Sequence, residues 1–156
     1  MKESLRISKQ NESLKAWLNN KGRGTINASV GFGKSKVAVD IILHANCKTL
    51  FLADRIKSLQ NFKEECKKWN VPQETFNKID FSCYVSTHKY KLDEYSFIIL
   101  DEADCISQAN FEHFDLFDLS HVKILGLTGT YPKEEQDFEK FCFLEKYAPR
   151  VFEYHM

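Results

Sequence analysis

Short apolar runs alternate with longer amphipathic stretches along most of the chain. Runs of apolar residues predict strands, and apolar residues three or four positions apart predict helices. The expected strands are residues 25–30, 49–52, 81–85, 97–100 and 122–127. The expected helices are residues 8–20, with Ser8 as the capping residue, 34–44, 56–69 and 133–144. This alternation predicts one α/β domain over residues 1–156, with a doubly wound, mainly parallel sheet and helices on both faces.

The run at residues 97–100 is apolar at every position. Such a run is typical of a central parallel strand that is covered on both faces. In sheets of this kind ligands bind outside the carboxyl ends of the strands. We therefore expect the functional residues to lie directly after strands.

Composition and charge narrow the class of protein. The 156 residues carry no net charge, so the chain lacks the strong basic excess common among nucleic-acid-binding proteins, although a local basic groove would suffice for a motor channel. The five cysteines form no C-x-x-C pair, which argues against structural zinc, and most are expected to be buried. No apolar run approaches the ~18 residues of a membrane span, and residues 1–10 do not resemble a secretory signal, so a cytoplasmic location without membrane contact is expected.

A glycine-rich loop follows the first expected strand. Residues 28–35, Ala-Ser-Val-Gly-Phe-Gly-Lys-Ser, nearly match the phosphate-binding pattern G-x-x-x-x-G-K-[ST], with alanine at the first position. The glycines let backbone N–H groups turn toward phosphate oxygens, and the next helix adds the partial positive charge of its N-terminus. Lys34 would neutralise the phosphates of ATP, and the Ser35 hydroxyl would bind Mg²⁺. The residues expected to bind the nucleotide here are Gly31, Phe32, Gly33, Lys34 and Ser35. A glycine turn that happens to precede Lys-Ser is the alternative.

Two acids directly follow the apolar run at residues 97–100. Charges at the edge of a core must be solvated or paired, and Mg²⁺ would supply that pairing. Asp101 would hold Mg²⁺, and Glu102 would orient and deprotonate the attacking water. The alternative is an acidic helix N-terminus stabilised by the helix dipole. Taken with the glycine loop, the acids predict a catalytic set of Lys34, Asp101 and Glu102.

These segments resemble the motifs of superfamily-2 helicases and translocases. Residues 28–35 are similar to motif I, usually A-x-T-G-x-G-K-T, in which the first residue is normally alanine. Residues 101–104 are similar to motif II, and residues 128–130 resemble motif III, usually S-A-T or T-A-T. The resemblance covers nearly the whole chain. It implies the first, ATP-binding RecA-like domain of such a motor, with ATP and Mg²⁺ as cofactors.

The resemblance also assigns roles outside the two main motifs. Gln10 falls where the family places a glutamine that reads the adenine edge. Thr128 and Thr130 would couple the γ-phosphate state to the nucleic-acid site. Residues 52–55 and 86–89 occupy the places of motifs Ia and Ib, the second resembling phage-encoded members, and their candidate nucleic-acid contacts are Arg55, Thr87 and His88.

Motif II is spelled DEAD, but the P-T-R-E-L-A and T-P-G-R signatures of DEAD-box RNA helicases are absent. The pattern is closer to the DNA helicase and restriction-translocase branch, so DNA is favoured over RNA as the partner. Such motors have two RecA-like domains, and the chain has no room for motifs IV to VI after motif III. A second domain or partner chain would therefore have to supply the arginine finger, which is worth ~10³–10⁵ in kcat.

Two further functions compete with a weakly hydrolysing half-motor. For the half-motor itself two explanations fit: a fragment of a longer helicase, or a single-domain protein that pairs with a separate second half or another partner. As an alternative to the motor, a non-catalytic module could use Mg-ATP to change shape and regulate a protein partner. A small kinase with the same loop is disfavoured by the DEAD tetrad and by the Thr-Gly-Thr turn at residues 128–130.

Overall fold

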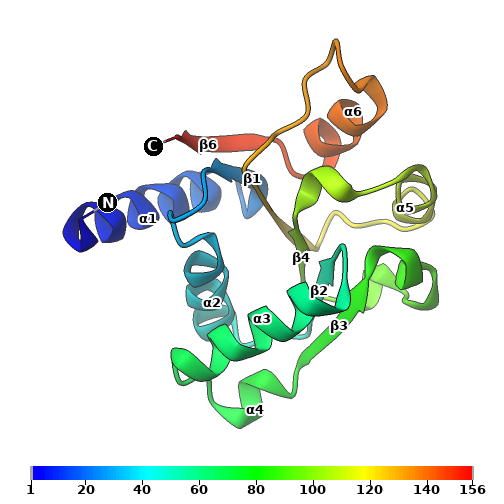
Figure 1. The fold of residues 1–156 in the computed structure, drawn as a ribbon. Helices are drawn as coiled ribbons and strands as arrows, with labels where there is room; N and C mark the ends of the chain where they lie inside the picture. The colour runs from blue at the N-terminus through cyan, green and yellow to red at the C-terminus, as the bar shows by residue number, and fades with distance from the viewer. Residues whose placement is uncertain (1, 156) are drawn as a thin grey trace.

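One six-stranded sheet forms the centre of the molecule. The computed structural model describes residues 2–155. The strand order is β3-β2-β4-β5-β1-β6 and every pairing is parallel, which confirms the predicted fold class (Figure 1). The strands are β1 (Arg23–Ala28), β2 (Thr49–Ala53), β3 (Ile79–Cys83), β4 (Phe97–Asp101), β5 (Lys123–Thr128) and β6 (Arg150–Tyr154).

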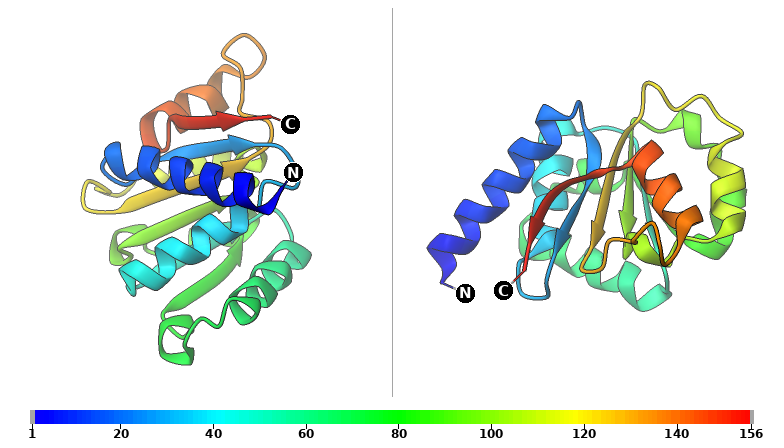
Figure 2. Two further views of the ribbon diagram at one scale, coloured as in Figure 1. Left: turned by 90° about the vertical axis from the view of Figure 1, so that its left-hand side faces the viewer. Right: turned by 90° about the horizontal axis from the view of Figure 1, so that it is seen from above.

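Helices cover both faces of this sheet, as Figure 2 shows. Helices α1, α2 and α3 contribute to one hydrophobic core, and α5 and α6 contribute to the other. The α-helices are α1 (Glu3–Asn19), α2 (Lys34–Ala45), α3 (Ile56–Lys68), α4 (Gln73–Phe76), α5 (Gln108–Phe114) and α6 (Phe138–Tyr147). Three 3-10 helices complete the set: η1 (Tyr84–Lys89), η2 (Leu92–Glu94) and η3 (Ala103–Cys105).

The central strands are apolar throughout because they divide their side chains between two cores. In β4, Ile99 enters the core beneath α1 and α2, whereas Ile98 and Leu100 enter the core beneath α5 and α6. All three side chains are fully buried. A strand that is buried on both faces gains hydrophobic burial at every position, which explains the unbroken apolar pattern.

Several predicted boundaries were wrong. Helix α1 begins at Glu3, so Ser8 lies inside it, and α6 begins at Phe138 because Asp137 accepts a hydrogen bond from the Lys140 N–H. Strand β3 ends at Cys83, where the chain enters η1 instead of continuing to residue 85. Helix α5 and strand β6 were missed entirely.

Burial of the cysteines also differs from expectation. Only Cys66 is buried, Cys47 and Cys83 are partly exposed, and Cys105 and Cys142 are exposed. Between residues 2 and 155, no helix is long and apolar enough to cross a membrane.

Candidate functional site

The two main motifs meet at the carboxyl edge of the sheet. Strands β4, β5 and β1 are neighbours, so the loops that follow them lie side by side. A cleft of about 460 Å³ opens there, between the glycine loop, the end of β4 and the start of α3. The residues that line it are Val30, Gly31, Gly33, Lys34, Ser35, Asp54, Arg55, Ser58, Asn61, Phe62, Glu65, Asp101 and Glu102. The predicted catalytic set therefore shares one cleft with the loop.

The glycine loop takes a backbone path that requires glycine at two positions. Gly31 and Gly33 have φ angles of 92° and 82°, in the left-handed region. Gly33 is the N-cap of α2, so the helix begins at Lys34 and its N-terminus adjoins the cleft. A Cβ on Gly33 would collide with the Gln10 side-chain nitrogen. The loop thus has the curvature and the helix dipole that an anion site needs.

Lys34 lies inside the loop with its charge close to two acids. Its Nζ donates a hydrogen bond to the Ala28 carbonyl oxygen at 2.6 Å. Burial lowers the pKa of Lys34, while the carboxylates of Glu102 and Asp101 act in the opposite direction. An anionic group in the cleft would compensate that burial far better than a neutral carbonyl does, because a charged partner makes the stronger hydrogen bond.

The acids at the end of β4 lie in a site that disfavours their charge. Burial raises the pKa of Asp101 to about 7, and the nearby carboxylates of Glu102 and Asp54 add to the effect. Burial likewise raises the pKa of Glu102. Glu102 also has a φ of 47°, an uncommon backbone conformation for this residue type that occurs at functional sites. Among the described residues no group of three or more acidic, histidine or cysteine side chains is arranged to hold a metal ion by itself. Ser35 and Asp101 line the same cleft, so they remain the candidate ligands for a divalent cation that a nucleotide would bring.

The last acid of the DEAD segment, Asp104, connects the end of β4 to the end of β5. Asp104 accepts hydrogen bonds from the hydroxyls of Thr128, at 2.7 Å, and Thr130, at 3.1 Å. Thr128 is fully buried, and its hydroxyl also accepts from the Thr130 N–H at 3.0 Å. Both predicted coupling threonines therefore bind one carboxylate. Asp104 was not among the predicted site residues, although the acidic tetrad contained the signal.

Gln10 and Phe32 stabilise the glycine loop, although neither residue lines the cleft. The Gln10 Nε2 donates to the Phe32 carbonyl at 2.9 Å and to the Gly33 carbonyl at 3.3 Å. The Phe32 ring is fully buried and contacts Phe152 and Tyr154 of β6, with ring centroids 5.7 and 5.9 Å apart. Only the main chain of Phe32 can therefore face a ligand in this conformation.

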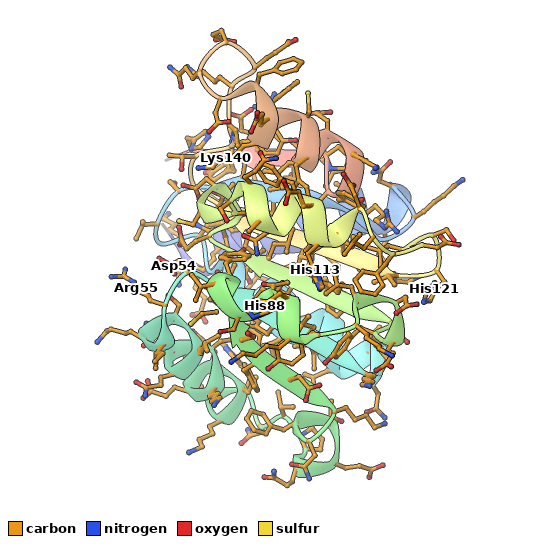
Figure 3. The ribbon with its side chains drawn as sticks, turned by 90° about the vertical axis from the view of Figure 1, so that its right-hand side faces the viewer. Asp54, Arg55, His88, His113, His121 and Lys140 are labelled. Carbon is orange, nitrogen blue, oxygen red and sulfur yellow. The ribbon has the colours of Figure 1, made fainter. Side chains whose placement is uncertain are left out.

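The candidate nucleic-acid residues differ in their exposure. Arg55 is exposed at the β2–α3 turn, lines the cleft and has its Nε 3.6 Å from the Asp54 carboxylate. His88 is exposed on η1, and Figure 3 shows both residues on the same side of the molecule. Thr87 is only 1% exposed, so its side chain is unavailable to nucleic acid here, because η1 turns it toward the protein interior.

A protein-family model covers most of the chain. Residues 4–133 match the family described as type III restriction enzyme, res subunit, and the chain belongs to that family. This membership confirms the resemblance to superfamily-2 helicases and translocases. A search of curated proteins finds no match.

Solved structures of helicases show the same fold at low sequence identity. The UvsW helicase from Bacteriophage T4 is 10% identical with a TM-score of 0.73, over 95% of this chain and 59% of that one. A hypothetical ATP-dependent RNA helicase from Sulfolobus tokodaii is 17% identical with a TM-score of 0.64, over 94% of this chain and 51% of that one. The Sulfolobus solfataricus SWI2/SNF2 ATPase core in complex with dsDNA is 18% identical with a TM-score of 0.61, over 89% of this chain and 34% of that one. The chain thus spans between a third and three fifths of these three proteins.

Proposed function

We propose that this chain is the Mg-ATP-binding RecA-like domain of an ATP-dependent nucleic-acid helicase or translocase. The observation that carries the proposal is the meeting of Lys34, Asp101 and Glu102 around one cleft at the carboxyl ends of β1 and β4. Membership of the restriction-enzyme family supports the same function.

The loop and α2 bind the phosphates of ATP in this proposal. Backbone N–H groups of residues 31–35 and the α2 N-terminus surround the phosphate oxygens. The Lys34 ammonium leaves the Ala28 carbonyl and pairs with a phosphate oxygen, which is a charge-assisted and stronger contact. In this proposal Gln10, whose side chain donates to the loop in the nucleotide-free structure, turns outward and reads the adenine edge.

Asp101, Glu102 and Ser35 act on the phosphate that is transferred to water. When bound, Mg²⁺ supplies charge neutralisation between the phosphate oxygens and the carboxylates. Asp101 and the Ser35 hydroxyl would hold the ion, and a positive charge at that position would favour the ionised form of Asp101. Glu102 accepts a proton from the attacking water, a role for which its raised pKa brings it closer to the working pH.

Asp104, with the two threonines that donate to it, couples the state of the γ-phosphate to the nucleic-acid site in this proposal. Arg55 and His88 are the exposed candidates for contacts with the phosphate backbone, whereas the buried side chain of Thr87 is not. We favour DNA over RNA, because the family is a restriction-enzyme family and one of the similar structures is bound to dsDNA. An arginine finger from a second RecA-like domain or partner chain is needed for full activity.

ATP turnover by the purified chain, measured with and without DNA and RNA, tests this function. We expect slow turnover that Lys34→Ala and Glu102→Gln abolish, and a larger response to DNA than to RNA. Glu139→Gln, an exposed change on α6 outside the cleft, is the matched control for Glu102→Gln. Nucleotide binding that never leads to turnover, with or without nucleic acid or a second domain, would instead indicate a regulatory module.

A further inference from the structure

A second cavity lies at the carboxyl edge of the sheet, beside the cleft but separate from it. It has a volume of about 780 Å³ and is enclosed by the β5–α6 loop, the first turn of α6 and β6. In Figure 1 this loop arches away from the sheet above α6. The cavity shares no lining residue with the glycine-loop cleft. Asp104 and Thr130 of the proposed coupling step line one part of it, but the proposed ATPase mechanism places no ligand in the cavity itself.

One side chain that lines the cavity has an unsatisfied hydrogen-bond acceptor. Asn27, on β1, is only 4% exposed, and its Oδ1 has no hydrogen-bond partner among the described residues. Thr25, two positions earlier on the same face of β1, donates its hydroxyl hydrogen to the Ala148 carbonyl. Buried acceptors are normally paired, so an exception at the wall of a cavity indicates a ligand that brings a donor. The terminal torsion of asparagine is soft enough for the amide to turn toward such a ligand.

The charges around the cavity favour a cation over an anion. Acidic residues outnumber lysine and arginine two to one among the lining residues, and they are Asp104, Glu134, Glu135, Asp137, Glu145 and Glu153. Of the three basic residues, Arg150 pairs with Glu153 at 3.2 Å, Lys140 lies 3.9 Å from Asp137, and Lys133 forms no ion pair within the described residues. Glu134 and Glu135 are exposed and form no ion pair within the described residues. An entering cation would meet the unpaired carboxylates of Glu134 and Glu135 and the Asn27 amide, which all line the cavity.

Aromatic rings on the cavity wall add a preference for a planar cation. Tyr131 and Phe141 line the cavity and contact each other edge to face, with centroids 6.4 Å apart. The Arg150 guanidinium already lies 5.5 Å from the centroid of the Tyr131 ring, so this part of the site tolerates such a group. A guanidinium stacks on rings and donates several hydrogen bonds in one plane.

We propose that this cavity is a binding site for a guanidinium or ammonium group, with Asn27 as the buried acceptor and Glu134 and Glu135 at the entrance. The bound cation would belong to an arginine or lysine side chain of a protein segment, or to a free polyamine. The site differs from the position of an arginine finger, because that finger would enter the glycine-loop cleft.

A ligand here would act on the proposed ATP site through three short connections. Asn27 directly precedes Ala28, whose carbonyl binds Lys34. Asn27 also pairs in register with Thr128, and Asp104, which binds Thr128, lines the cavity. Cation binding and nucleotide binding should therefore alter each other's affinity, and by the same factor in both directions. This linkage rests on the proposed function, whereas cation binding itself does not.

Titration of the nucleotide-free chain, followed by NMR of the Asn27 side-chain amide, tests the site. The probes are the blocked tripeptide Gly-Arg-Gly, the same peptide with citrulline as an uncharged isostere of arginine, and spermidine. We expect saturable shifts at Asn27 and Tyr131 with a charged probe and none with citrulline. Binding of the arginine peptide alone would indicate a protein segment, and binding of spermidine at equal or higher affinity would indicate a polyamine.

Variants separate this site from general effects on folding. Asn27→Leu should weaken binding about tenfold, the loss expected for one hydrogen bond to a charged group, and Asn27→Asp should strengthen it. Because Asn27 is buried, Glu134→Gln with Glu135→Gln provides a surface test that leaves the core unchanged, and Glu139→Gln is its control. Lys34→Ala should bind the cation normally even if it abolishes ATP binding. Equal binding of citrulline, or unchanged affinity in both Asn27→Leu and the double glutamine variant, would overturn the proposal.

Discussion

The Phe32 ring should determine nucleotide affinity without touching the nucleotide. It is fully buried against Phe152 and Tyr154, while Gln10 holds the main chain on either side of it. Phe32→Ala removes a buried ring, a change that costs about 3–5 kcal/mol of folding free energy. The free energy of unfolding of a domain of this size is about 5–15 kcal/mol. We therefore expect the variant to remain folded at low temperature but to lose the fixed position of its glycine loop.

The loss of affinity follows from the entropy of a loosened loop. If residues 30–32 become mobile, binding must order them again at about 1 kcal/mol each. That total of about 3 kcal/mol corresponds to roughly 100-fold weaker nucleotide binding. Calorimetric titration with a non-hydrolysable ATP analogue would measure the change, and urea denaturation would measure stability in parallel.

Phe114→Ala is the matched control for this experiment. Phe114 is equally buried and contacts two aromatic rings, Phe143 and Tyr147, but it belongs to the core beneath α5 and α6. We expect a similar loss of stability with unchanged nucleotide affinity. Equal losses of nucleotide affinity in the two variants would refute the reasoning, because the effect would then reflect stability alone. A Phe32→Ala variant that binds nucleotide with wild-type affinity would refute it as well.

Three other perturbations have defined outcomes. Folding raises the pKa of Asp101 from 3.8 to about 7. In metal-free protein the Asp101 carboxyl therefore contributes its full share of the folding free energy below pH 3.8, and this share is lost as the pH rises through 7. Asp101→Asn should therefore be more stable than wild type at pH 8, by up to about 4 kcal/mol in urea denaturation with EDTA, with the difference shrinking toward pH 4. Gly33→Ala should destabilise the chain by about 1–2 kcal/mol through its left-handed backbone, and Gln10→Ala in the same chain should restore part of the loss by removing the collision; no restoration would contradict the contact. Asp104→Asn keeps only one acceptor oxygen for Thr128 and Thr130, so stimulation of turnover by DNA should fall while ATP affinity stays within about twofold; a proportionate loss of both would argue against a coupling role.

The features that sequence predicts well here are local ones. A glycine loop between a strand and a helix specifies its own backbone path, and Gly31 and Gly33 have the left-handed conformations that the pattern requires. The acids after β4 could be placed because a fully apolar strand marks where its carboxyl end must be. Parallel order then brings the two segments together, since strand ends of one sheet meet at one edge.

The features that sequence misses depend on distant partners. Strand β6 is partly exposed and lies at the sheet edge, so it lacks the apolar run that marks β4, and only its pairing with β1 defines it. The phosphate-loop pattern assigns a main-chain role to position 32 and says nothing about the direction of its side chain, which β6 determines. Thr87 was predicted as a candidate nucleic-acid contact, but η1 turns its side chain inward. Asp104 gains its role only when β4 and β5 lie side by side.

Calorimetric titration of the wild-type chain and of Lys34→Ala with Mg-ATP tests the central claim most directly. We predict one binding event per chain in the wild type, with affinity that depends on Mg²⁺, and no measurable binding in the variant, whose unfolding transition should match the wild type. Equal binding by both proteins would contradict the account, because the nucleotide would then lie outside the cleft that Lys34, Asp101 and Glu102 define.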